Sequence, residues 1–357
     1  INPIFQCLSE NYLNQDAPKL NVAFFDIETD FDPERGFADP SDPFMPITAI
    51  TVHLQWLDAL ITLALPPKTL TMEQAKEECK EWGEEVVLYE NEGDMLQAFL
   101  DLIQDSDILT GWNSEGYDIP YTVNRVSRVL SKDDTRRFCL WKQLPKKREY
   151  EKYGKSAETY DLVGRVHLDS LELYRKYTYE ERHTYRLDAI GELEVGERKT
   201  VYEGTLDQLY NNDFRRFIEY NRQDVALLDK LDKKLRFIDL SNELAHANTV
   251  LLQTTMGAVA VTEQAIINEA HHRGLQVPNR PRRDDENTAA AGAYVAFPKK
   301  GLHKWIGSMD LNSLYPSVIR ALNMAPETIV GQIRPDISLA RVEEDMGLKK
   351  KSFAGSW

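Results

Sequence analysis

Two carboxylates at the end of an apolar stretch are the first residues in this sequence that could do chemistry. The stretch reads Val22-Ala-Phe-Phe-Asp-Ile-Glu-Thr29, so Asp26 and Glu28 stand two residues apart. In a β-strand, residues i and i+2 share one face, which would point both carboxylates the same way. Two like charges about 4 Å apart repel by roughly 4 kcal/mol at an effective dielectric constant near 20. The pair therefore predicts either a bound cation or an ordinary acidic pair that faces a loop.

A calcium-binding loop is a third interpretation, because acidic residues alternate from Asp26 to Asp32. Such a loop needs a glycine at its sixth position and a bidentate glutamate at its twelfth. Counted from Asp26, these positions hold Phe31 and Phe37. The sequence therefore argues against this kind of calcium site.

A second acid lies in the sequence Gly111-Trp-Asn-Ser-Glu-Gly-Tyr-Asp118. Gly111 and Gly116 permit a turn between a strand and a helix, and Asp118 would stand near the start of that helix. Aspartate is a common helix N-cap, because its carboxylate accepts hydrogen bonds from the first free N–H groups. Taken alone, the motif favours the N-cap over a chemical role.

The third candidate is the pair Tyr220 and Asp224, in the sequence Tyr220-Asn-Arg-Gln-Asp224. Residues i and i+4 of a helix are neighbours on one face, so the phenol and the carboxylate could address one site. Taken alone, a core tyrosine and a solvated aspartate explain the pair better.

Together the three motifs predict more than each does alone. Each places acid at the end of a predicted buried element, so four carboxylates could converge on one pocket. Oxygen ligands of this kind suit two divalent cations, Mg²⁺ or Mn²⁺. Two such ions about 3.5–4 Å apart can activate water and stabilise the leaving oxygen of a phosphodiester.

The elements that must position these acids follow from the pattern of apolar residues. Short apolar runs predict strands and a 3.6-residue period predicts helices. Strands followed by alternating helices and strands are typical of a mixed sheet covered by helices, an α/β fold. We expect strands at residues 22–27, 47–54, 56–65, 86–89, 108–112, 293–297 and 305–311, and helices at 93–104, 120–130 and 213–248.

The composition excludes several classes of protein. The chain has 357 residues, enough for about two or three domains. It carries 43 Lys and Arg against 58 Asp and Glu, a net charge of −15, which argues against a simple nucleic-acid coat but not against an enzyme with local basic patches. No apolar run approaches the roughly 18–20 residues of a membrane span. Three scattered cysteines suit a reducing cytoplasm.

Basic and aromatic residues interleave between residues 141 and 165, around Gly154. This pattern predicts a projecting hairpin. Cations suit phosphates and aromatic faces can stack on unpaired bases, so the hairpin could meet nucleic acid. An ordinary solvated hairpin is the alternative.

These motifs resemble a known family. Asp-Ile-Glu, Gly-Trp-Asn-x-x-x-Tyr-Asp-Ile-Pro-Tyr and Tyr-Asn-x-x-Asp-Val are similar to the three proofreading exonuclease motifs of family B DNA polymerases, most closely those of tailed phages. Residues 308–317, Ser-Met-Asp-Leu-Asn-Ser-Leu-Tyr-Pro-Ser, resemble the first palm motif of the same polymerases. The four motifs occur in the family's order across residues 21–330.

The resemblance implies a ribonuclease-H-like 3′–5′ exonuclease domain that hydrolyses 3′-terminal nucleotides with two metal ions. Asp26, Glu28, Asp118 and Asp224 would hold the ions, and Tyr220 would orient the attacking water. Asp169 is a further acid in a motif-like setting, but a helix N-cap explains it better. The residues that would contact DNA are Asn113, Lys146, Lys147, Arg148 and Tyr153.

The polymerase part departs from the family pattern. Asp310 would hold the metals of the incoming nucleotide, which Leu311, Ser313, Leu314 and Tyr315 would contact. A second catalytic aspartate should follow in an Asp-Thr-Asp motif, and this sequence has none after Asp310. We therefore expect that nucleotide transfer needs a second chain, or a missing C-terminal part, that carries fingers, thumb and the rest of the palm; that part could also bind a sliding clamp.

The implied organisation has four parts. Residues 1–20 would be the remnant of an N-terminal domain, 21–240 the exonuclease domain, 241–290 a helical connector and linker, and 291–357 the start of the palm. The expected partners are single-stranded 3′ ends and primer–template DNA, with no membrane, in the cytoplasm of a host cell if a phage encodes the chain. The alternatives are a DNA-binding assembly module with a silent nuclease site and, remotely, a structural metal-binding protein.

Overall fold

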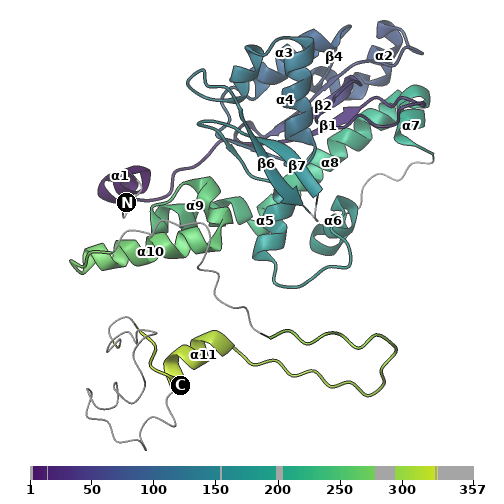
Figure 1. Cartoon of the computed structure of the whole chain (residues 1–357). Coiled ribbons are helices and arrows are strands. Elements are labelled where there is room, and N and C mark those ends of the chain that lie inside the picture. The colour runs from purple at the N-terminus through teal and green to yellow at the C-terminus, as the bar shows by residue number, and fades with distance from the viewer. Residues whose placement is uncertain are drawn as a thin grey trace, which may run out of the picture. The chain divides into compact units, whose positions relative to one another are not determined.

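The computed structural model describes residues 3–13, 15–152, 155–197, 204–277, 294–325 and 328. The chain divides into two compact units, Ile1–Pro281 and Arg282–Trp357. The first unit holds a mixed sheet with helices on both faces, as the sequence predicted (Figure 1). The two units are described separately below.

The sheet of the first unit has six strands in the order β4-β3-β2-β1-β5-β8. Strand β1 lies at its centre, antiparallel to β2 and parallel to β5, and the outer pairs β3–β4 and β5–β8 are parallel. The bounds are β1 Val22–Thr29, β2 Ile47–Leu54, β3 Ala59–Ala64, β4 Val86–Leu88, β5 Ile108–Thr110 and β8 Val166–His167.

The two faces of β1 bury different residues, because side chains alternate along a strand. Ala23, Phe25 and Ile27 pack into a core with α3 (Glu92–Leu102) and α4 (Asp118–Val129). Val22 and Phe24 pack on the opposite face, in a core with α8 (Phe214–Leu235). This alternation assigns Asp26 and Glu28 to the α8 face of the sheet.

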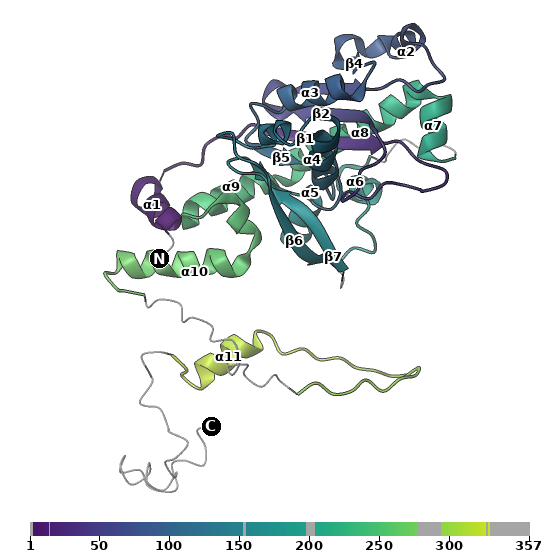
Figure 2. The ribbon, with the colours of Figure 1, turned by 45° about the horizontal axis from the view of Figure 1, so that its top comes forward.

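Further helices complete the layer that contains α8. α5 (Ser170–Tyr177) and α6 (Leu187–Val195) share its core, while α2 (Met72–Glu78) and α7 (Leu206–Asn212) pack beside its N-terminal half. Figure 2 shows α3 and α4 on one side of the sheet and α8 on the other, beside β1 and β2. Short 3₁₀ turns link the elements, at Gln55–Leu57, Lys80–Glu85, Asp134–Phe138 and Leu252–Met256.

Most predicted bounds differ from the observed ones by one or two residues, and two elements differ more. The strand expected at 56–65 begins only at Ala59, because a 3₁₀ turn ending in left-handed Asp58 (φ 49°) reverses the chain first. The helix expected at 213–248 is interrupted at Arg236 (φ 53°), whose left-handed backbone ends α8 and starts α9 (Phe237–Asn248) in a new direction.

Further helices precede and follow the sheet domain in the sequence. α10 (Ala258–His272) follows α9, so the described part of the expected connector is helical. Near the N-terminus, Pro3–Tyr12 forms helix α1, which buries none of its residues.

The predicted hairpin is present within residues 141–165. β6 (Lys146–Lys152) and β7 (Lys155–Asp161) pair antiparallel in a two-stranded sheet separate from the main one. Their register joins Lys146 to Asp161 at the base of the hairpin and Lys152 to Lys155 near its tip.

The described part of the second unit contains helix α11, Leu314–Ala321. The strands predicted at 293–297 and 305–311 are wrong for the residues that the structure describes, since 294–311 form neither strand nor helix. Apolar runs become strands only when their N–H and C=O groups find a partner strand, and no such partner lies among the described residues. Their large side chains, such as Trp305, are exposed.

Candidate metal centre

Three carboxylates from two elements meet on the α8 face of the sheet. Asp26 and Glu28 project from β1, and Asp224 projects from α8 opposite them. One ligand oxygen from each residue lies within 4.8 Å of those of the other two. Three hard oxygen donors at this separation repel one another and fit Mg²⁺ or Mn²⁺. The structure therefore brings together three of the four acids that the sequence singled out.

The position of Asp224 follows from the amphipathic pattern of α8. Phe214, Phe217, Asn221, Val225 and Leu228 are buried at intervals of three to four residues and fix which face of the helix meets the sheet. Asp224 belongs to that same face and is buried as well. Asp213 caps the N-terminus of the helix by accepting a hydrogen bond from the Arg216 N–H.

Asp118 lies next to β1 but outside the group of three. Its Oδ1 accepts a hydrogen bond from the Ile27 N–H at 3.2 Å. Strand β5 pairs only with Val22–Phe24, so β1 extends beyond it and the Ile27 N–H needs another acceptor. Asp118 is the first residue of α4 and its N-cap is Tyr117, which makes no side-chain cap hydrogen bond. The N-cap interpretation of Asp118 is therefore wrong.

Tyr117 connects these acids electrostatically. Burial raises the pKa of its phenol, and the nearby carboxylates of Asp118, Glu28 and Asp26 raise that pKa further. The phenol oxygen also lies 3.1 Å from the Thr29 Oγ1. All three acids therefore act on one phenol, which places the Asp118 carboxylate in the same acidic environment as the β1 pair.

Asp169 anchors the loop that leads to Asp118. Its carboxylate caps α5 through the Leu171 N–H (2.8 Å) and also accepts from the N–H groups of Asn113 (3.1 Å) and Glu115 (3.0 Å). Burial raises the pKa of Asp169 to about 6. The N-cap interpretation of Asp169 is confirmed, and its second role in holding the loop was not predicted.

The same loop is fixed at two further points. The Ser114 Oγ lies 2.8 Å from the His167 Nε2, and burial lowers the pKa of His167 to about 3. At Gly111, a Cβ atom would stand 2.6 Å from the Phe25 carbonyl oxygen. Gly111 is therefore required by close packing against β1, in addition to the turn that the sequence suggested.

Tyr220 lies one helical turn before Asp224 on α8. It is half-buried and packs against a cluster that includes Phe217 and Ala49. The packing agrees with the core alternative, and a role in orienting water remains a prediction.

Asn221 is the residue that sequence reasoning missed. It is fully buried, and its Nδ2 donates a hydrogen bond to the Asp26 Oδ2 at 2.9 Å. It stands three residues before Asp224, and this helical spacing on a face already assigned to the site was the available signal.

The residues predicted to contact DNA have varied surroundings. Lys147 forms an ion pair with Glu158 at 2.7 Å, and Arg148 pairs with both Glu115 and Asp161. Lys146 is exposed at the base of the hairpin. Tyr153 lies outside the described residues. Asn113 adopts a left-handed backbone (φ 61°) and donates its N–H to Asp169.

The predicted nucleotide-binding residues belong to the second unit. Asp310 and Leu311 lie in the irregular segment before α11, Ser313 is the N-cap position, and Leu314 and Tyr315 begin the helix. The side chains of all five are exposed.

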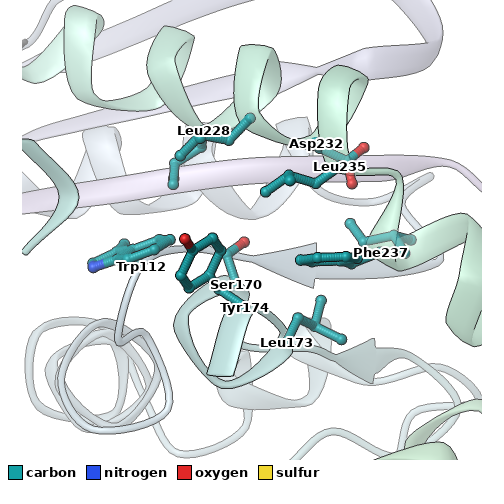
Figure 3. Close-up of a pocket in the computed structure, with 10 residues that line it drawn as sticks. Trp112, Ser170, Leu173, Tyr174, Leu228, Asp232, Leu235 and Phe237 are labelled. Atoms are coloured by element: carbon teal, nitrogen blue, oxygen red, sulfur yellow. The ribbon is translucent and has the colours of Figure 1, made fainter. Parts of the chain in front are cut away.

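A cavity elsewhere in the first unit is too small for a nucleotide. It lies between α5, α8 and the start of α9, where Tyr174, Asp232 and Phe237 line it (Figure 3). Its volume of about 30 Å³ has room for about one water molecule. Burial raises the pKa of Asp232 to about 6.

Two family models match the sequence. The model described as DNA polymerase family B, exonuclease domain, matches residues 2–190, and the model described as DNA polymerase family B matches residues 249–352. The chain belongs to DNA polymerase family B. The predicted resemblance is confirmed, and the acidic cluster lies partly in the first matched region and partly, through α8, beyond it.

The relatives of this family B chain include phage and cellular enzymes. It is 32% identical to the DNA-directed DNA polymerase of Escherichia phage RB69 over 349 residues, which cover 92% of this chain and 38% of that polymerase. It is 33% identical to the DNA-directed DNA polymerase of Enterobacteria phage T4 over 248 residues, 69% and 27% of the two chains. With the DNA polymerase delta catalytic subunit of Bos taurus the identity is 29%, over 76% of this chain and 25% of the subunit.

This chain thus spans less than two fifths of these relatives. Within its described residues, no helix is both long enough and apolar enough to cross a membrane.

Proposed function

We propose that the first unit is a metal-dependent 3′–5′ exonuclease that proofreads for a family B DNA polymerase. The observation that supports this proposal is the group formed by Asp26, Glu28 and Asp224, with ligand oxygens within 4.8 Å of one another. When bound, two Mg²⁺ or Mn²⁺ ions would supply charge neutralisation and a more acidic water. Asp118, held against β1, would be the fourth acid of the site.

The residues of the site have two roles in this proposal. The carboxylates of Asp26, Glu28, Asp118 and Asp224 would hold the ions and offset their positive charge. Tyr220 orients the attacking water with its phenol. The water oxygen forms a bond to the terminal phosphorus while the bond to the 3′ oxygen of the preceding nucleotide breaks. A deoxynucleoside monophosphate leaves, and the shortened strand keeps a 3′ hydroxyl.

The hairpin formed by β6 and β7 would help to separate primer from template. Its partners would be single-stranded 3′ ends and primer–template DNA, contacted by Lys146, Lys147, Arg148, Tyr153 and Asn113. Ion pairs hold Lys147 and Arg148 within the hairpin region, so DNA phosphates would have to compete with Glu158 and Glu115 for them.

The second unit would contribute to nucleotide transfer through Asp310 and the start of α11, with Leu311, Ser313, Leu314 and Tyr315 at the nucleotide. A second chain, or further sequence, would carry the fingers, the thumb and the rest of the palm, and could bind a sliding clamp. This organisation, with an exonuclease at 21–240, a connector at 241–290 and a palm fragment from 291, would act in the cytoplasm of a phage host.

Incubation of a 3′-labelled single-stranded oligonucleotide with Mg²⁺ tests the nuclease. We expect release of mononucleotides by the unaltered chain and at least a 100-fold loss in an Asp26→Ala, Glu28→Ala double variant. The matched control replaces two exposed acids outside the site, Glu84→Ala and Glu90→Ala, and should keep full activity. Equal rates for the parent and the Asp26, Glu28 variant would overturn the assignment.

The second candidate is a DNA-binding assembly module with a silent nuclease site. Binding of the same oligonucleotide without any mononucleotide release, in both Mg²⁺ and Mn²⁺, would favour it. The converging acids support the nuclease instead, since a silent site has no need to keep mutually repelling carboxylates together.

A further inference from the structure

A row of polar side chains crosses three strands of the sheet beneath α8. Asp26 of β1 is paired in register with Thr51 of β2, and Thr51 with Thr62 of β3. Residues in register on neighbouring strands share a face, so all three side chains meet α8. Thr51 and Thr62 are fully buried, and apolar residues such as Ala49 and Ala64 flank them. Buried hydroxyls in an apolar core need hydrogen-bond partners.

Asn221 of α8 closes this row onto the metal centre. The two threonine Oγ1 atoms are 2.8 Å apart. The Thr51 hydroxyl donates to the Asn221 Oδ1 at 2.5 Å, and the Asn221 Nδ2 donates to the Asp26 Oδ2 at 2.9 Å. Asn221 is fully buried, which shields these bonds from water.

The direction of the hydrogen bonds follows from counting donors. A threonine hydroxyl has one hydrogen, and that of Thr51 points to Asn221. Thr62 must therefore donate to Thr51, and Thr62 in turn accepts from the Arg222 Nη1 at 3.3 Å. Arg222 itself pairs with Glu85. A directed series of donors thus runs from Arg222 to Asp26.

The Asp26 carboxylate fixes which end of the Asn221 amide faces it, and the hydrogen bond from Thr51 agrees with that orientation. The reversed amide would set its carbonyl oxygen against the Asp26 carboxylate, and both are acceptors. The observed orientation presents an N–H group to one carboxylate oxygen and so restricts rotation of that carboxylate. Partners that orient a metal ligand in this way affect metal affinity by about 10- to 100-fold when they are removed.

We infer that Asn221 is a positioning residue, which orients the Asp26 carboxylate for a divalent cation and is itself oriented by Thr51 and Thr62. The inference rests on the proposed nuclease function. It applies to a residue that touches no substrate, so its test must measure cation binding separately from catalysis.

Titration of the full chain with Mn²⁺ alone, followed by the electron paramagnetic resonance of free Mn²⁺, gives that measurement. We expect Asn221→Ala to weaken Mn²⁺ binding by about 10- to 100-fold. Asn221→Asp, which replaces the N–H donor by a second carboxylate beside Asp26, should weaken binding at least as much. Asn211→Ala, at an asparagine on α7 whose side chain donates to Asp207, is the control and should leave binding unchanged.

A nuclease assay separates positioning from general damage. In Asn221→Ala the Mn²⁺ concentration that gives half-maximal rate should rise, while the rate at saturating Mn²⁺ returns to within about threefold of the parent. If Asn221→Ala does not fold, as judged by circular dichroism, the Thr51→Val variant tests the inference instead. This variant keeps Asn221 and removes the hydroxyl that donates to the Asn221 Oδ1. Thr51→Val should weaken Mn²⁺ binding by a smaller but measurable factor, about threefold or more.

The outcomes distinguish this inference from the proposed function. A parent chain that neither binds Mn²⁺ nor degrades DNA overturns the proposed function. A parent that does both, with a folded Asn221→Ala or Thr51→Val variant that binds Mn²⁺ within twofold of the parent, overturns only the role of Asn221.

Discussion

Asp118 illustrates how one side chain can serve both the backbone and a site. Its carboxylate accepts the Ile27 N–H that strand β5 is too short to pair, and it shares an acidic environment with Asp26 and Glu28 around Tyr117. The hydrogen bond needs only an oxygen acceptor, whereas a cation needs the negative charge. The two roles can therefore be separated by substitution.

Asp118→Asn should remove the charge and keep the acceptor. We expect a free energy of unfolding within about 1 kcal/mol of the parent and a nuclease rate lowered by about 100-fold or more. Asp118→Ala removes both, so it should also destabilise the chain by about 1–3 kcal/mol because the Ile27 N–H stays buried without an acceptor. Urea unfolding and oligonucleotide degradation measure the two effects, and an Asp118→Asn variant with parental activity would contradict the assignment of Asp118.

At the scale of elements, the site depends on where β1, α4 and α8 begin and end. Asp26, Glu28 and Asp224 meet because strand and helix periodicity fixes which side chains share a face, and β1 and α8 each follow that periodicity closely. The residues at which helices and strands begin and end are predicted less well by periodicity. The break at Arg236 and the late start of β3 depend on the left-handed backbone of Arg236 and Asp58. Neither residue type predicts a left-handed conformation at these positions.

Contacts between elements were the least predictable part of the site. Asn221 carried no signal by itself, since its partners Asp26 and Thr51 lie 195 and 170 residues away in sequence. The strands expected before α11 failed for the same reason, because an apolar run predicts a strand only where another strand is available to pair with it. Periodicity therefore predicts which face of a helix or strand is buried. Contacts between elements decide which polar side chains meet, and the sequence does not show them.

Gly111 and Gly116 allow a matched test of the loop between β5 and α4. In Gly111→Ala the new methyl group would meet the Phe25 carbonyl oxygen, which belongs to the central strand and has little room to move. We expect a loss of about 1–3 kcal/mol in unfolding free energy. Gly116→Ala would meet the Asn113 Oδ1 at 3.3 Å, an end of a side chain that can shift, so it should cost less. Thermal or urea unfolding of both variants measures this, and equal losses would contradict the close-packing explanation.

At the scale of the whole molecule, the apolar core lies within the first unit. Among the described residues, the buried apolar side chains run from Val22 to Val250, and α1 and α11 bury none of theirs. The three cysteines sample these environments. Cys79 and Cys139 are buried in the first unit, and Cys7 is exposed on α1.

Thiol reactivity should report this difference. Burial raises the pKa of Cys79 to about 11 and also raises the pKa of Cys139, so both stay protonated and shielded near pH 8. We expect a thiol reagent at that pH to label Cys7 rapidly, with one equivalent of label per native chain. In denaturant all three cysteines should be labelled. Mass spectrometry of the labelled peptides identifies the sites, and rapid labelling of Cys79 in the native chain would contradict the described packing.

The bond between the Ile27 N–H and the Asp118 carboxylate gives the central strand a natural probe. Most backbone N–H groups of a sheet donate to a carbonyl of a neighbouring strand. The Ile27 N–H donates instead to a carboxylate oxygen of Asp118, so its chemical shift depends on the state of that carboxylate. In a ¹⁵N-labelled sample its resonance should follow loading and chelation of the centre, with no probe attached and no nucleic acid added.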